Sequence, residues 1–413
     1  MWLLVLFFLK VSCQLNSNGT ESESYLTPSE DFTKKLFENY DNEVAPFCND
    51  KSGIERQAWI LILKFIRFKL IDVDEPKEQV TTVVEVKQNW FDQRISWDPE
   101  ENDNITQLFI RLDKVWSPPF TAFSASEVVE QRDQDYRMAS IHSYGSVTAH
   151  IPVKLTINCK FNMSNYPFDT QICEIITGIP SIPTHLHKLS VDFSPALSDN
   201  LCNLGNSAWD VIDIRSGLVN IKNSYEFVDS TRIGILKFQL KRNPTFYMYM
   251  IVLPIFIINA LSFSGVFLKN TTKVDRLTIG LTHIMTMTFI LGIIADKLPK
   301  TNSVPLLGKY IIFGLCTMII AMLISTYLKK ITEYLAGKLG NTQNSIGKHI
   351  RRFIGRPSRI IFIFAFQIAN IASIIYLLYR YYDFETRFKL PESCQVRSKT
   401  MEFTHDEEDC GCF

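Results

Sequence analysis

The sequence lacks the residue patterns on which most enzymes and nucleic-acid-binding proteins depend. Its 43 Lys and Arg residues are balanced by 43 Asp and Glu residues, so there is no basic surplus to attract a phosphate backbone. It also has no glycine-rich phosphate loop, no paired zinc-binding Cys and His motif, and no nucleophile elbow. We therefore expect no enzymatic activity, no cofactor, no resident metal and no nucleic-acid partner.

Long apolar runs are present instead, and four of them lie in the second half of the chain. They cover 246–268, 277–295, 304–328 and 360–378, and each is close to the ~20 residues that cross a bilayer as a helix. The basic stretch between the last two predicts a short cytoplasmic loop at 329–358. We expect a transmembrane four-helix domain at 243–382.

The first residues form a shorter apolar run that is typical of a secretory signal. Residues 1–13 end in the small residues Ser12 and Cys13, although the run has no basic start. The alternative, a membrane anchor, needs a longer run. With the signal removed, the amino terminus is outside, and four spans return the tail at 383–413 to the outside as well. We expect a multi-pass protein of the plasma membrane, with both termini extracellular and the lipid bilayer as a partner.

Residues 27–242, between the signal and the first span, read mainly as β-strands. A short helix comes first, and the mixed apolar run at 54–68 that follows it has no clear period. Apolar and polar residues then alternate from Thr81 to Trp90 and again from Ser146 to Cys159. Half-buried strands with large aromatic residues predict an all-β extracellular sandwich.

Two cysteines, Cys159 and Cys173, enclose 13 residues directly after the second of these strands. Cysteines of an exported domain can pair, and a bridge that closes a loop of this size contributes about 3 kcal/mol in the chain-entropy model. Tyr166-Pro167 inside the loop is the kind of X-Pro bond that can be cis in a tight turn. Sequence leaves the pairing of the other exported cysteines open. These are Cys48, Cys202, Cys394, Cys410 and Cys412.

The second apolar segment carries polar residues that lipid would not tolerate on every side. On a helix, hydroxyls, bulky apolar residues and an acid share one face, and another acid lies one step before it. The face consists of Thr278, Thr282, Met285, Phe289, Ile293 and Asp296, preceded by Asp275. Several copies around an axis would enclose a pore with charged mouths and an apolar constriction. The alternative is a helix buried among its neighbours, with each threonine hydroxyl bonded to its own backbone.

The 273–299 stretch and the 159–173 loop resemble the Cys-loop, or pentameric ligand-gated, ion channels, and the likeness covers nearly all of 81–382. Tyr166-Pro167, Asp169 and Gln171 reproduce the loop that names this family. The resemblance is to a divergent subunit whose pore motif is closer to the nicotinic, cation-conducting branch. It implies a disulfide between Cys159 and Cys173. It also implies a homo- or hetero-pentamer in the plasma membrane, including the synaptic membrane. A small extracellular ligand that binds at the subunit interfaces is expected to open this channel.

The same resemblance assigns residues that couple ligand binding to the pore. In the family, the Cys loop passes motion of the sandwich to the linker after the pore helix. The coupling residues carried over are Tyr166, Pro167, Phe168, Asp169, Arg242, Leu298 and Pro299.

The pore motif also indicates the sign of the ion. Cation-conducting members carry an acid before the basic residue at the inner mouth, as in Val274-Asp275-Arg276, whereas anion-conducting members usually carry Pro-Ala-Arg. The implied selectivity residues are Asp275, Thr278, Thr282 and Asp296, and the implied gate is formed by Met285, Phe289 and Ile293. Acidic rings enrich cations, so monovalent cations are the expected ions and anion conduction is the alternative.

The likeness is weakest where the ligand should bind. Acetylcholine-binding members have a tryptophan shortly after the loop and a vicinal cysteine pair before the last strand, whereas this chain has Pro180 and no such pair. Glu85 stands where a complementary-side tryptophan is often found. The aromatic candidates that remain are Phe123, Tyr225 and Phe227, and the alternative for each is packing. An accessory subunit that binds no agonist is therefore a second hypothesis.

Other polar motifs give weaker indications. Asn18, Asn104 and Asn162 begin sequons and are candidate glycosylation sites in an exported domain. His185 and His187 are two apart and would share one face of a strand, where a third ligand would complete a zinc site. We favour solvated histidines there and expect no metal.

Overall fold

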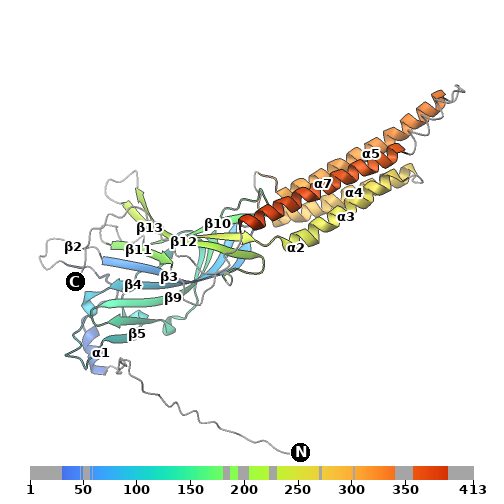
Figure 1. Ribbon diagram of the computed structural model, residues 1–413. Helices are drawn as coiled ribbons and strands as arrows, with labels where there is room; N and C mark the ends of the chain where they lie inside the picture. Colours follow the sequence, from blue (N-terminus) through green and yellow to red (C-terminus); the bar gives the residue numbers. More distant parts are fainter. Residues whose placement is uncertain are drawn as a thin grey trace, which may run out of the picture.

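The computed structural model consists of a strand-rich domain followed by a bundle of long helices (Figure 1). It describes residues 30–46, 48–49, 56–57, 59–179, 187–193, 204–222, 230–268, 272–300, 303–339 and 357–388. The short helix α1, Glu30–Phe37, lies at the end of the strand-rich domain that is remote from the bundle. The predicted all-β sandwich followed by four apolar helices is confirmed.

The larger sheet has the strand order β11-β3-β4-β9-β8-β5, with β7 also paired to β9. Its strands are β3 (Trp59–Asp74), β4 (Gln79–Phe91), β5 (Gln107–Arg111), β7 (Ala125–Glu130), β8 (Met138–His142), β9 (Ser146–Asn158) and β11 (His187–Phe193). Every second residue of β4 and β9 is buried, as the alternation predicts, so one face of this sheet forms the core.

The smaller sheet has the order β12-β13-β10-β6. Its strands are β6 (Thr121–Ala122), β10 (Thr170–Gly178), β12 (Trp209–Lys222) and β13 (Ser230–Arg242). Phe68 of β3 and Phe238 of β13 lie with ring centroids 4.9 Å apart, so the core lies between the two sheets. Two minor strands, β1 (Cys48–Asn49) and β2 (Arg56–Gln57), pair with each other.

Most of the apolar run at 54–68, which the sequence left unassigned, lies in strand β3. Leu61, Leu63 and Phe65 are buried at every second position, but burial resumes at Phe68 and Leu70. The pairing of β3 with β4 shifts register between Phe65 and Arg67. This irregularity breaks the two-residue period and explains why the sequence pattern was ambiguous.

Four helices are long and apolar enough to cross a membrane within the described chain: Thr245–Phe267, Lys273–Lys297, Leu306–Tyr327 and Arg359–Arg387. The first comprises α2 (Thr245–Tyr247), the π-helical turn η5 (Met248–Val252) and α3 (Leu253–Phe267). The others belong to α4 (Lys273–Lys297), α5 (Leu306–Leu339) and α7 (Pro357–Arg387). Helix α5 extends into the segment assigned to the cytoplasmic loop, and α7 continues past residue 382.

The helices are held together by close backbone approach and by polar contacts. A Cβ at Gly280 of α4 would lie 1.8 Å from the sulfur of Met322 in α5, so the Met322 side chain packs directly onto this glycine. His283 Nε2 is 2.8 Å from Asn259 Oδ1, and the Asn259 amide donates to Asn370 Oδ1 at 3.4 Å. These contacts connect α4, α3 and α7. His283 of α4 is thus hydrogen-bonded to a neighbouring helix.

Candidate functional site

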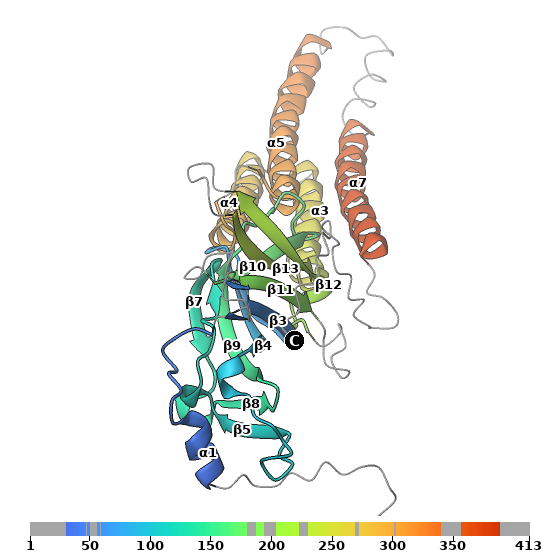
Figure 2. The same cartoon turned by 90° about the vertical axis from the view of Figure 1, so that its left-hand side faces the viewer.

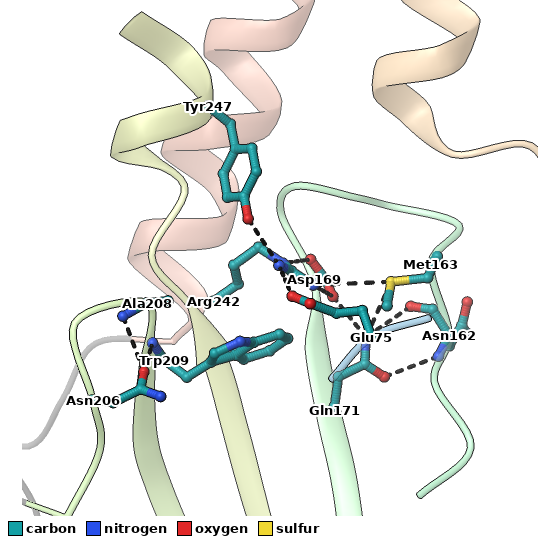
Figure 3. Close-up of polar contacts among 10 residues, drawn as sticks. All are labelled: Glu75, Asn162, Met163, Asp169, Gln171, Asn206, Ala208, Trp209, Arg242 and Tyr247. Carbon is teal, nitrogen blue, oxygen red and sulfur yellow. Dashed lines mark hydrogen bonds and ion pairs between the residues drawn. The ribbon is translucent and has the colours of Figure 1, made fainter. Parts of the chain in front are cut away.

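The junction between sandwich and helices is built around the guanidinium of Arg242, the last residue of β13 (Figure 3). Its Nε donates to Asp169 Oδ1 at 2.8 Å, and its Nη1 donates to Glu75 Oε1 at 2.8 Å. Nη1 also donates to the Tyr247 hydroxyl at 3.2 Å. Asp169 lies just before β10, Glu75 in the β3–β4 turn and Tyr247 in α2. One side chain thus joins both sheets to the first membrane helix.

Three aromatic rings surround the same guanidinium. Its central carbon lies 4.1 Å from the ring centroid of Trp209, 4.7 Å from that of Tyr166 and 5.6 Å from that of Tyr247. Burial disfavours the charged form of Arg242, but the negative charge and hydrogen bonds of Asp169 outweigh it and raise the pKa above its usual value. The buried cation is therefore stabilised mainly by the carboxylate of Asp169, and Glu75 adds to it.

A disulfide between Cys159 and Cys173 closes the loop that supplies Asp169. The Tyr166-Pro167 peptide bond in this loop is cis. The Gln171 amide donates to Asp169 Oδ2 at 2.6 Å and to the Asn162 carbonyl at 3.1 Å, which fixes the carboxylate against the loop backbone. The Asp169 side chain is therefore oriented by its own loop before it contacts Arg242.

The Cys loop contacts two membrane helices directly. The Tyr166 carbonyl accepts a hydrogen bond from the Leu307 N–H of α5 at 3.1 Å. Phe168 packs against the rings of Tyr381 and Phe384 of α7, with centroids 5.9 and 6.2 Å away. The family resemblance implied a coupling contact between this loop and the linker after the pore helix. The loop contacts in the structure reach α5 and α7.

The two predicted coupling residues of the linker, Leu298 and Pro299, follow directly after α4. Leu298 is buried in the same apolar cluster as Tyr166 and Phe168, and Pro299 is half-buried. Their role in coupling stays a prediction, because none of the contacts described above joins them to the Cys loop.

Three residues of this site could not be recognised from the sequence: Glu75, Trp209 and Tyr247. Glu75 was hidden because β3 was not recognised, so the β3–β4 turn could not be placed at the membrane end. The sequence also gave no indication of the ion pair between Lys241 Nζ and Glu385 Oε2 of α7, at 2.9 Å. The Lys241 side chain is 6% exposed and the Glu385 side chain 38%, so a partly buried ion pair joins the last strand to the end of the fourth span.

Helix α4 presents the predicted pore face away from the rest of the chain. Met285, Phe289 and Ile293 are 76%, 69% and 49% exposed, and Thr278, Thr282, Asp275 and Asp296 are exposed as well. The opposite side of α4 packs against other helices through Gly280, His283, Met287 and Ile294. Lipid, another subunit or a pore can cover exposed apolar side chains of a membrane helix, and the Thr and Asp residues on the same stripe disfavour lipid.

Two details of α4 bear on the alternative of a helix buried among its neighbours. The Thr278 hydroxyl donates to the Val274 carbonyl at 3.0 Å, as that alternative expects, but the residue is exposed. Asp275 occupies the third position of the helix, and its carboxylate accepts from the Thr272 N–H at 2.8 Å in a capping box. The acid therefore also stabilises the start of the helix.

The structure locates only one of the three ligand-binding candidates. Phe123 follows β6 and is 46% exposed, with its ring close to Gly178. Tyr225 and Phe227 lie outside the described residues. Glu85 of β4 lies 3.5 Å from Arg67 and 3.4 Å from His150, so this part of the sheet is charged instead of aromatic. The aromatic pocket stays a prediction.

The other motifs are located only in part. Asn104 and Asn162 are exposed on the sandwich, so a glycan could reach both side chains, whereas Asn18 lies outside the described residues. So do the signal at 1–13, His185 and the cysteines at 202, 394, 410 and 412. The side chains of Cys48 and His187 are not described either. Within the described ranges no cluster of three potential metal ligands occurs.

Comparisons with known proteins all indicate the same family. Residues 29–244, more than half of the chain, match the family described as "Neurotransmitter-gated ion-channel ligand binding domain". Similar relatives include the betaine receptor acr-23 of Caenorhabditis elegans, 23% identical over 75% of this chain and 59% of its own length. The mouse (Mus musculus) 5-hydroxytryptamine receptor 3A is 23% identical over 77% of this chain and 65% of its own length.

A third relative is the acetylcholine receptor subunit beta-type unc-29 of Caenorhabditis elegans, 25% identical over 81% of this chain and 64% of its own length. The chain thus spans less than two thirds of each of these relatives. Their names specify three different small ligands, so the comparison by itself does not select one.

Proposed function

Because the chain belongs to the Cys-loop family of neurotransmitter-gated ion channels, we propose that it is a subunit of a cation-selective pentameric channel. A small extracellular ligand bound between subunits opens it, and monovalent cations pass along the axis lined by α4. The observation that supports this most strongly is the exposed stripe of α4, with an acid at each end and bulky apolar residues between them.

The family membership confirms several expectations from the sequence. The family consists of ion channels, so the chain is not an enzyme. The chain is a plasma-membrane protein, with four membrane-spanning helices after an extracellular domain. Its synaptic placement and the extracellular position of both termini remain part of the proposal.

The arrangement around Arg242 suggests how ligand binding opens the pore. Strand β13 continues into α2 with only Asn243 and Pro244 between them, so a shift of the sandwich moves the first span directly. The Cys loop is attached to Arg242 and also rests on α5 and α7. A ligand that binds better when this junction is rearranged shifts the population toward the open state by its differential affinity.

A second function is favoured by one specific observation. Glu85 is engaged by Arg67 and His150 where an aromatic wall for a cationic ligand would be expected. An accessory subunit needs the pore-lining face and the junction but no complete ligand pocket. The alternative is therefore a subunit that lines a heteromeric receptor and binds no agonist.

Expression of the chain alone in oocytes separates the two functions. We expect Met285→Ser to wet the apolar constriction and to give a spontaneous current without any ligand. Met250→Ser is the matched control, because Met250 is 64% exposed on the first span and lies outside the α4 stripe. A surface-expressed Met285→Ser chain without current would contradict a self-sufficient channel and favour the accessory subunit.

A further inference from the structure

The exposed stripe of α4 changes from polar to apolar at Met285. Helix α4 packs against α3 and α5, and Figure 2 shows it at the side of the helical bundle that lies away from α7. Because the first span leads inward from the extracellular domain, α4 begins at the cytoplasmic side of the membrane. Thr278 and Thr282 therefore lie on the cytoplasmic side of Met285, and Phe289 and Ile293 lie on its extracellular side. Met285 is the first apolar residue of the stripe on a path from the cytoplasm.

The thioether of Met285 is open to small solutes, whereas that of its near neighbour is not. Met285 is 76% exposed, more than any other large apolar residue that the structure describes. Met287, two residues further along the same helix, is 0% exposed and faces the other helices. The two sulfur atoms have the same chemistry and differ only in access, so Met287 is an internal reference for the reactivity of Met285.

The apolar part of the stripe is short. From Met285 to Ile293 it extends about 12 Å along the helix axis, and from Phe289 to Ile293 only about 6 Å, at about 1.5 Å per residue. If Met285 became polar, the apolar part would be about half as long. An apolar constriction closes a pore by dewetting, so a shorter one favours the entry of water and ions. The polarity of one sulfur atom in each subunit thus sets the length of the dry section.

We propose that Met285 is an oxidation site, and that its conversion to the sulfoxide by hydrogen peroxide from the cytoplasm opens the channel without ligand. A lone pair of the thioether sulfur attacks one peroxide oxygen, and the S–O bond forms as the O–O bond breaks. The sulfur loses two electrons, and the peroxide is reduced to one molecule of water. The sulfoxide oxygen accepts hydrogen bonds, so keeping it dry in the constriction is costly.

The position of Met285 gives the reaction a side. Peroxide from the cytoplasm reaches the sulfur past the hydroxyl-bearing part of the stripe, whereas peroxide from outside must first pass Phe289 and Ile293. The molecule is uncharged, so the acid at either mouth does not repel it. A methionine sulfoxide reductase restores the thioether with a thiol reductant, and the oxygen leaves as water. The inference rests on the proposed function, because it requires that α4 lines the pore.

Excised membrane patches from oocytes that express the full-length chain test the opening. The Cys316→Ser background removes the exposed free cysteine of α5. Hydrogen peroxide at the cytoplasmic face should raise the spontaneous current at least about tenfold, because the dry section is shortened. The same peroxide at the extracellular face should act more slowly. Methionine sulfoxide reductase with reduced thioredoxin, applied to the cytoplasmic face, should return the current to its starting level.

Three variants assign the response to Met285. Met285→Leu has a similar volume and no sulfur, so its current should not respond to peroxide. Met250→Leu is the matched control and should respond as the parent does, since Met250 is exposed on the first span outside the α4 stripe. Met285→Gln places a polar oxygen near the position of the sulfoxide oxygen. It should conduct without peroxide, and peroxide should add nothing.

Met285→Ser separates failure of this inference from failure of the proposed function. If Met285→Ser conducts and the peroxide-treated parent does not, oxidation does not open the gate, and the channel function stands. If neither conducts, the self-sufficient channel fails, and opening by oxidation fails with it. A peroxide response that persists in Met285→Leu would assign the oxidised residue to another part of the chain.

Mass spectrometry of the purified full-length chain tests the modification without any current. Met285 and Met287 lie on one peptide between Arg276 and Lys297, and fragmentation of this peptide shows which of them carries the added oxygen. After brief treatment with peroxide, we expect the sulfoxide at Met285 at least about tenfold more often than at Met287, because a buried side chain reacts only after local opening. Equal oxidation of the two residues would overturn the proposal.

Discussion

Arg242 and Asp169 form an ion pair at 2.8 Å in which the two side chains are only 1% and 2% exposed. The pair joins the last strand of the sandwich, which continues into the first span, to the disulfide-closed loop, whose Tyr166 and Phe168 contact α5 and α7. A buried charge pair is strongly destabilising when one partner is lost, because the other charge remains without compensation. The contact therefore holds the two coupling elements in one arrangement.

Replacement of one partner of this ion pair should strongly destabilise the folded protein. We expect Arg242→Gln to lower the free energy of unfolding by about 3–5 kcal/mol, because Asp169 stays buried and unpaired. Thermal unfolding of the detergent-purified chain, followed by tryptophan fluorescence, measures the loss. Arg387→Gln is the control: its pair with Asp383 is exposed, and about 0.5 kcal/mol or less is expected.

The double variant Arg242→Met with Asp169→Asn tests whether the loss comes from the pair itself. Removing both charges should recover part of the stability, so the effects of the single variants are not additive. Additive losses in the double variant would contradict a direct coupling between the two side chains.

Asp210 of β12 lies near the same junction and makes the stability of the protein depend on pH. Burial raises the pKa of its carboxyl, Lys241 opposes this and Glu385 adds to it. The pKa of Asp210 is higher in the folded than in the unfolded state. The contribution of Asp210 to stability is therefore fully present at acidic pH and is lost as the pH rises through the folded-state pKa. Asp210→Asn should therefore raise the midpoint of thermal unfolding at neutral pH and leave it nearly unchanged at acidic pH.

Asp213→Asn on the same strand is the matched control for this pH series, since its carboxylate forms an exposed pair with Arg215. Its unfolding midpoint should follow the wild type at every pH. A lower midpoint of Asp210→Asn at neutral pH would contradict the direction assigned to the Asp210 pKa.

Two neighbouring isoleucines test the orientation of α4. Ile293 is 49% exposed on the predicted pore face, whereas Ile294 is 5% exposed on the opposite side. In a Cys316→Ser background, which removes the exposed free cysteine of α5, Ile293→Cys should react with a water-soluble thiol reagent applied from outside. Ile294→Cys should react at least about tenfold more slowly, since local opening must precede reaction. The reverse order would show that α4 faces the pore with its other side.

Two glycines of α4 test the close approach of α4 and α5. A methyl at position 280 would lie 1.8 Å from the Met322 sulfur, so the flexible Met322 side chain must move aside, and Gly280→Ala should destabilise the bundle by about 1 kcal/mol. A methyl at position 292 meets nothing within 4 Å, and Gly292→Ala should be neutral or stabilising by up to about 1 kcal/mol. Thermal unfolding of both variants provides the comparison, and equal midpoints would refute the close helix approach.

The sequence predicted best those elements whose residues repeat with a regular period. Strands β4 and β9 bury every second residue, and α4 places its acids, hydroxyls and apolar residues on one stripe, so both patterns could be read directly. The register shift in β3 interrupts the period, and that strand was missed. Its turn, which carries Glu75, was missed with it.

Contacts between distant parts of the chain could not be predicted from the sequence. The family resemblance assigned both Arg242 and Asp169 to coupling, but nothing in the spacing of Lys241 and Glu385 indicates an ion pair. The fourth helix continues beyond residue 382, where Phe384 packs against Phe168 and Glu385 pairs with Lys241. Such partners appear only after folding.

The central claim, a cation pathway lined by α4, is tested most directly by the reversal potential of the Met285→Ser current. External NaCl is diluted with an uncharged osmolyte while the current–voltage curve is recorded. With Asp275 and Asp296 at the two mouths, we predict a negative shift, and a smaller shift when both are replaced by Asn. A positive shift would contradict the claim, because it would mean that anions carry the current.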